Sequence, residues 1–172
     1  MNAELENDVI GLRMQRELPG SPAEVFAAYT TPERQRLWLS MLGPDEGEVE
    51  TTVDLRVGGQ WEARFRPNPQ TRVHDIQTYR EIDRPYRLVS DLVAESIIDG
   101  QAMPVLESHI VMTFEPRDTA AGVGTGTLVT VEQTGFPAAE MRDFFMGVVW
   151  PGGLDRLGAC VAGLDHSDGT SR

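Results

Sequence analysis

The chain has 172 residues, of which 40% are hydrophobic and 24% charged, so it is long enough for one domain with a core of its own. Its formal net charge is −12, and a surface of that sign repels phosphate backbones and anionic lipid headgroups. We therefore expect no nucleic acid and no membrane among its partners. A single cysteine, Cys160, excludes an internal disulfide and a CxxC metal site.

Neither end of the sequence carries a recognisable targeting or membrane segment. No apolar run approaches the roughly 18 residues of a membrane-spanning helix, and the opening MNAELENDVIG is acidic, unlike a signal peptide. The last residues, 165–172, are polar and have no periodic apolar face. We expect a cytoplasmic protein with one domain over residues 1–164 and a disordered tail over residues 165–172.

A strand and two short helices are predicted at the start of the domain. Apolar Ile10, Leu12 and Met14 alternate with other residues, as in a strand with one buried face, over residues 9–18. The sequence SPAE at residues 21–24 has a serine cap, a proline at the first helical position and a glutamate three residues after the cap. TPE at residues 31–33 repeats this helix-start pattern, which predicts a second short helix after the first.

The middle of the chain predicts a series of strands separated by turns. Glycine and proline pairs such as Gly58-Gly59 and Asp99-Gly100 provide the breaks. Strands this close together are typical of an antiparallel meander and not of βαβ units. The predicted strands cover residues 49–57, 61–66, 76–82, 86–93, 107–115 and 125–134.

From Pro137 onward the apolar spacing becomes helical, which predicts one long helix over residues 138–163. Leu154 and Leu157 should face the sheet, because this is the one long amphipathic element available to cover it. The sequence WPGG at residues 150–153 interrupts the pattern, so we expect a kink or break there. The fold class is α+β: a curved antiparallel sheet of about six to seven strands around a C-terminal helix.

Five motifs in this order resemble the START-like, or SRPBCC, helix-grip superfamily, which also holds the birch-pollen allergens and the polyketide cyclases. Within it, the chain is most similar to the activator of heat-shock protein 90 ATPase homologue family. Each motif is weak alone, but all five at plausible spacing are fairly specific. They are SPAEVF at 21–26 with TPE at 31–33 and Trp38, VGGQW at 57–61, EIDRPYRLV at 81–89, EQTGF at 132–136, and residues 150–157. The sequence departs from the family pattern at Pro151, where a residue compatible with a helix is commoner.

The resemblance implies a cavity between the concave face of the sheet and the last helix. Strand parity and helical spacing select the side chains that should point into it, with Ser90 and Gln133 as polar groups among apolar ones. The alternative is an ordinary packed core, which the sequence supports equally well. The predicted lining residues are Trp61, Phe65, Leu88, Ser90, Ile110, Met112, Phe114, Val129, Gln133, Met141, Phe145 and Val148.

Catalytic and metal-binding patterns are weak. His74, His109 and His166 have no partner at metal-ligand spacing, and no nucleophile–base grouping can be read. We therefore predict no catalytic residue, no metal and no cofactor. Cys160 is interpreted as a structural thiol, and Gly58-Gly59 as a tight turn because no Lys-Ser/Thr pair follows. Arginines near strand ends are interpreted as solvated edge residues in preference to an anion site: Arg64, Arg66, Arg80 and Arg87.

Three functions fit these observations. The first is a binding module whose cavity holds a small apolar or amphipathic molecule, and a homodimer is compatible with it. The second is an enzyme of the polyketide cyclase or hydrolase type, which needs an inward-facing acid–base pair that the sequence does not present. The third, implied by the family name, is an interaction protein that resembles chaperone ATPase activators. We rank it last, because this chain has no room for the separate N-terminal domain of the eukaryotic activators.

Overall fold

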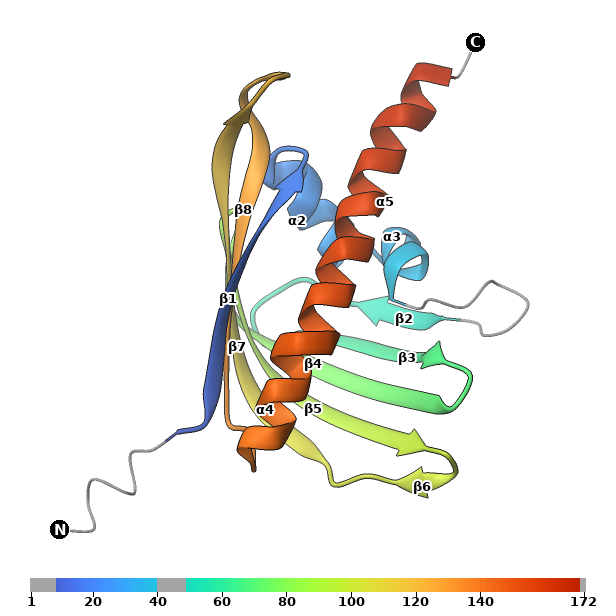
Figure 1. The fold of residues 1–172 in the computed structure, drawn as a ribbon. Helices are drawn as coiled ribbons and strands as arrows, with labels where there is room; N and C mark the ends of the chain where they lie inside the picture. Colours follow the sequence, from blue (N-terminus) through green and yellow to red (C-terminus); the bar gives the residue numbers. More distant parts are fainter. Residues whose placement is uncertain (1–8, 40–48, 171–172) are drawn as a thin grey trace, which may run out of the picture.

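A curved antiparallel sheet with helices on its concave face makes up the domain (Figure 1). The computed structural model describes residues 9–39 and 49–170, and side chains as far as residue 163. The strands run in the order β1-β8-β7-β5-β4-β3-β2, and short β6 pairs with β5. Their bounds are β1 Gly11–Pro19, β2 Glu50–Val53, β3 Gln60–Asn68, β4 Thr71–Asp83, β5 Arg87–Ile98, β6 Gln101–Ala102, β7 Leu106–Thr119 and β8 Gly122–Thr134. The predicted α+β helix-grip architecture is confirmed.

Two short helices follow β1, as the sequence predicts: α2 (Pro22–Thr30) and α3 (Pro32–Trp38). The Ser21 hydroxyl accepts a hydrogen bond from the Glu24 backbone N–H at 3.3 Å, which confirms the predicted cap. Gly58 has a φ of +84°, and a Cβ at Gly59 would lie 2.2 Å from the Asp54 carbonyl oxygen. The glycine pair therefore makes a tight turn.

Aromatic rings fill one end of the concave face, between the two short helices and the sheet. Tyr29 stacks on Trp38 with 5.4 Å between ring centroids, and it meets Trp61 edge-on at the same distance. Phe26 meets Phe114 edge-on at 5.5 Å. Edge and offset ring contacts of this kind stabilise beyond the area that they bury. We call this part of the concave face the closed half.

The C-terminal helix runs diagonally across the concave face (Figure 1). It consists of α4 (Ala139–Phe144), a π-helical turn (Phe145–Val149) and α5 (Trp150–Thr170). Leu154 and Leu157 are each 1% exposed, so the predicted buried side of this helix is confirmed. The helix continues past the predicted end at Gly163, as far as Thr170. The predicted disordered tail covers residues 165–172, of which the last two lie outside the described part. No helix in the described ranges is long and apolar enough to cross a membrane.

One predicted lining residue, Val148, does not face inward, and the π-helical turn is the reason. The Trp150 N–H bonds to the Phe145 carbonyl, five residues back, instead of the usual four. Pro151 directly follows, and its ring would press on the carbonyl of an ordinary preceding turn. The wide turn lets the helix continue, but it shifts the buried face by one residue. Phe145 and Trp150 are half-buried, whereas Val148, predicted to face inward, is 58% exposed.

This shift in the buried face is testable with two alanine substitutions. Leu154→Ala should lower the free energy of unfolding by about 2–5 kcal/mol, because it leaves a cavity in the core. Val148→Ala should change it by less than about 0.5 kcal/mol, as at other exposed positions. Urea denaturation followed by circular dichroism measures both. A loss at Val148 as large as that at Leu154 would contradict the π-helical turn.

Candidate functional site

The helices cover only part of the concave face. α5 packs against α2, α3 and β1, and α4 and the π-helical turn also lie against β1. The ends of β3, β4 and β5 beside the β3–β4 turn extend beyond the helix (Figure 1). On this part of the concave face the side chains are only half-buried. We call it the open half, and it comprises Phe65, Val73, Asp75, Ala94 and Ser96.

Most of the predicted lining residues lie in the packed core and not against an open space. Eight of them are at most 5% exposed: Trp61, Leu88, Ser90, Ile110, Met112, Phe114, Val129 and Gln133. Phe65, Met141 and Phe145 are half-buried and pack against the edge of that core. These three predicted lining residues therefore face the core but still keep some surface accessible to solvent.

The two predicted polar anchors are already used within the protein. Gln133 donates to the Ser108 hydroxyl at 2.8 Å and accepts from the indole N–H of Trp150 at 2.8 Å. Ser90 donates to the side-chain oxygen of Gln77, also at 2.8 Å. Buried polar groups with satisfied hydrogen bonds are stable, so these residues hold the helix and strands together.

Asp75 is the functional candidate that the sequence analysis missed. It lies on the concave face of β4, and its partners in register are Ala63 on β3 and Ala94 on β5. Neither neighbour carries a polar side chain, so the adjacent strands offer no side-chain hydrogen bond to its carboxyl at this register. Its Oδ1 atom is buried without a hydrogen-bond partner among the described residues. Burial of the carboxyl raises its pKa to about 7.

The sequence contained one signal for Asp75, namely its parity with inward-facing residues. The predicted strand began at Ile76, because an aspartate interrupts the apolar alternation that defines a buried face. In the structure β4 begins at Thr71, and Val73, Asp75 and Gln77 all share the concave face. A strand extended five residues toward the N-terminus would have placed an acid inside.

Other polar groups lie on the same face, near this carboxyl or further along β4. Burial raises the pKa of the Tyr29 phenol, and the charge of Asp75 raises it further, while a hydrogen bond with Gln77 lowers it. The Tyr79 hydroxyl is also buried and has no hydrogen-bond partner within the described chain. β4 thus brings an acid, an amide and a phenol to one apolar face. With a pKa near neutrality, Asp75 can accept or donate a proton there.

Two of the histidines lie on the other, convex face of the sheet. The His74 Nε2 atom lies 2.7 Å from the Glu62 carboxylate, and the His109 Nδ1 atom lies 2.7 Å from the Asp91 carboxylate. His166 lies beyond the residues whose side chains are described. No three histidine, cysteine or acidic residues in the described ranges gather closely enough to hold a metal ion.

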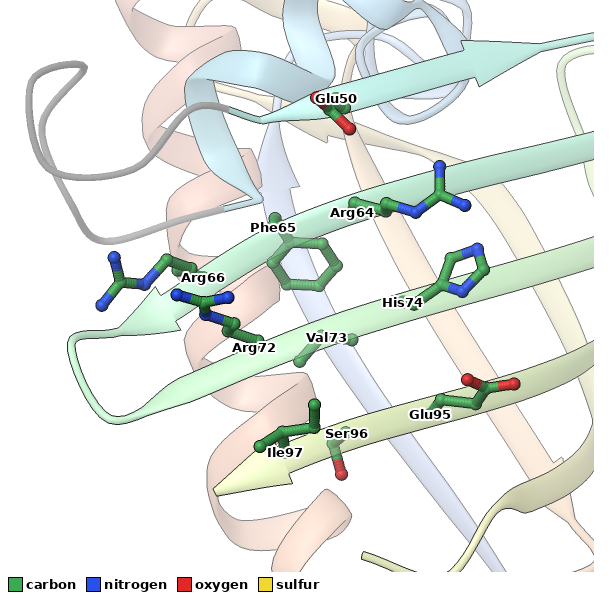
Figure 2. A pocket seen from close by; sticks show the side chains of 10 residues that line it. All are labelled: Glu50, Arg64, Phe65, Arg66, Arg72, Val73, His74, Glu95, Ser96 and Ile97. Carbon is green, nitrogen blue, oxygen red and sulfur yellow. The ribbon is translucent and has the colours of Figure 1, made fainter. Parts of the chain in front are cut away.

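A hollow of about 310 Å³ at this end of the sheet is lined by convex-face side chains of both signs of charge and also by Phe65, Val73 and Ser96 of the open half. Figure 2 shows its side chains, which come from β2, β3, β4 and β5. Arg64 pairs with Glu62 at 3.3 Å, and Arg66 donates to the Pro69 carbonyl at 2.7 Å. Mixed charges of this kind suit a solvated surface better than an apolar ligand.

The remaining arginines are held in ion pairs, and Cys160 has the features of a structural thiol. Arg80 pairs with Asp91 at 2.7 Å and Arg87 with Glu81 at 3.1 Å, so both neutralise neighbouring carboxylates. Cys160 is half-buried on α5, and burial raises the pKa of its thiol. A thiol with a raised pKa forms less of the reactive thiolate.

Comparison with known sequences and structures agrees with this architecture. A sequence profile of the family described as Activator of Hsp90 ATPase homolog 1-like protein matches residues 19–162. No curated protein sequence matches the chain.

Solved bacterial structures share the fold at low sequence identity. A Nitrosomonas europaea protein superimposes with a TM-score of 0.65 at 19% identity, covering 91% of this chain and 97% of the other. For a Rhizobium loti protein the TM-score is 0.60, the identity 24% and the coverage 90% and 99%. For a Mycobacterium smegmatis protein they are 0.63, 20%, 92% and 95%. Such likeness concerns the fold alone.

The pH dependence of stability tests the surroundings of Asp75. Its pKa is higher in the folded protein than in the unfolded chain, so its contribution is complete at low pH and is lost as pH rises through about 7. Relative to Asp75→Asn, the wild-type protein should lose about 2–3 kcal/mol of unfolding free energy between about pH 5 and pH 8. Denaturant titrations of both proteins across this range measure the difference.

Asp91→Asn is the matched control, because the pKa of Asp91 is lowered by hydrogen bonds from His109 and Arg80. Its contribution has the opposite sign: it is present above the unfolded pKa and is lost as pH falls. A difference between wild type and Asp75→Asn that stays constant with pH would show that Asp75 is well solvated.

Proposed function

We propose that this chain, which belongs to the Activator of Hsp90 ATPase homolog 1-like family, binds an apolar or amphipathic small molecule against the open half of its concave face. The observation that carries the proposal is Asp75, whose buried Oδ1 has no hydrogen-bond partner in the described part of the chain. A polar atom without a partner inside an apolar face is costly for the protein alone. A ligand that supplies a hydrogen bond removes that cost.

The surroundings of Asp75 support a mostly apolar ligand. Phe65 and Ala94 are partly buried and lie against the edge of the core, while Val73 and Ser96 are half-buried on the same face. Ligand sites in proteins are mainly apolar surfaces with a few polar groups that fix the orientation of the ligand. The open half has this composition, because Asp75 is its one ionisable group.

An enzyme of the polyketide cyclase or hydrolase type is the second candidate. The observation in its favour is again Asp75, because a carboxyl with a pKa of about 7 is suited to proton transfer at neutral pH. Tyr29, an ionisable group that interacts with Asp75, has a pKa raised by burial, so at neutral pH it stays protonated. We prefer binding, because beside Asp75 the described residues show no second group that titrates near neutrality and could complete an acid–base pair.

A pair of substitutions on β5 tests the binding site. Ala94 lies on the concave face beside Asp75, whereas Glu95 lies on the convex face of the same strand. Ala94→Trp should fill the open half and weaken binding of the neutral fluorescent probe N-phenyl-1-naphthylamine by roughly tenfold or more. Glu95→Trp should leave the affinity within about twofold. Fluorescence titration measures both.

Circular dichroism and urea denaturation must show that both variants are folded. Equal affinity for the probe in the two variants would place its binding outside the open half. A probe that does not saturate the wild-type protein would count against small-molecule binding itself.

A further inference from the structure

We infer that the open half selects hydrophobic amines, which bind as cations with the ammonium group on Asp75 and the apolar tail over Phe65 and Ala94. This inference rests on the proposed binding function and adds the chemical class of the ligand. It concerns one ionisable side chain and the charges that surround it.

The position of Asp75 suits a ligand that enters from the open half. Asp75 as a residue is only half-buried, although its Oδ1 atom is fully buried. The carboxyl therefore lies at the boundary between the packed core and the accessible part of the concave face. Its neighbours in register, Ala63 and Ala94, end at Cβ, and Ala94 is only half-buried, so accessible surface lies beside the carboxyl on the β5 side. An ammonium group has three donors and no acceptor, which matches an acceptor without a partner.

No basic side chain competes for this carboxyl within the described residues. Burial is the cause of its raised pKa, and no nearby positive charge opposes it. The two half-buried arginines of the C-terminal helix are used elsewhere: Arg142 donates to the Gly11 carbonyl at 3.2 Å, and Arg156 to the Trp38 carbonyl at 2.7 Å. A cation from the ligand is thus the missing partner of the carboxylate.

Charge also disfavours the opposite class of amphipathic ligand. A fatty acid would place its carboxylate beside Asp75, and like charges in a poorly solvated site repel strongly. The net charge of −12 adds a long-range repulsion for anions and an attraction for cations. A neutral alcohol can donate one hydrogen bond, but it gains no charge attraction, so it should bind more weakly than an amine of equal length.

Binding of an amine should release a proton from Asp75 near neutral pH. The titratable group that faces this carboxyl from α2 is the Tyr29 phenol, and its pKa is raised by burial. From the neighbouring strands Ala63 and Ala94 face it, and along β4 the next inward side chain is Gln77. Asp75 is therefore the group whose ionisation changes with pH in this range, while an alkylamine stays protonated. Amine affinity should rise as pH increases through about 7.

Calorimetric titration with three probes of equal chain length tests the inference: octylamine, octan-1-ol and octanoic acid. Octylamine should bind roughly tenfold more tightly than octan-1-ol, and octanoate most weakly. Asp75→Asn should weaken octylamine roughly tenfold and leave octan-1-ol within about twofold. Asp91→Asn, which removes a carboxylate from the convex face, should change neither affinity. Octylamine affinity should increase about tenfold from about pH 6 to pH 8 in the wild-type protein and stay level in Asp75→Asn.

The outcomes separate this inference from the proposed function. Octan-1-ol or octanoate binding as tightly as octylamine, or an octylamine affinity unaffected by Asp75→Asn, would overturn the amine selectivity while binding at the open half stands. If none of the three probes binds, and N-phenyl-1-naphthylamine does not bind either, the proposed function itself fails.

Discussion

A single C-terminal helix has to cover the concave face of a sheet that is much wider than the helix. Neighbouring strands lie about 4.8 Å apart, so the seven strands of the main path span roughly 30 Å. A helix with its side chains is only about 10 Å wide. The helices α2 and α3 close part of the remaining width with their aromatic residues, and the half formed by the ends of β3, β4 and β5 stays uncovered.

Specific polar contacts decide where along this width the helix lies. The indole of Trp150 donates to Gln133, which in turn donates to Ser108, so the helix is joined to β8 and β7. Further along, Arg156 donates to the Trp38 carbonyl and joins α5 to α3. Buried hydrogen bonds are directional, and breaking one leaves a polar group without a partner. They tie the helix to β7 and β8 at one point and to α3 at another, which fixes its diagonal course over the sheet.

The π-helical turn makes these contacts compatible with one helix. It places Phe145 and Trp150, five residues apart, on the same side, so that Phe145 packs on Phe136 at 5.2 Å while Trp150 reaches Gln133. Asp75 is the point at which this arrangement departs from simple burial of apolar groups. Such departures are expected where a protein binds something, because an uncompensated buried acid lowers stability. The fold thus combines a covered apolar core with an acid whose buried Oδ1 has no hydrogen-bond partner among the described residues.

The sequence by itself determined the order of the elements, the Ser21 cap of the first short helix, the antiparallel strands and the inward side of Leu154 and Leu157. These features depend on local periodicity and turn chemistry, which are determined by residues close together in the sequence. Only the tertiary structure decided that Val148 faces solvent, because the π-helical turn that moves it arises where Pro151 meets the packing of Phe145 and Trp150. It likewise decided that most predicted lining residues are core and that Asp75 is the buried acid. The environment of a side chain is set by residues distant in sequence, for Asp75 by Tyr29, Ala63 and Ala94, and periodicity does not record those contacts.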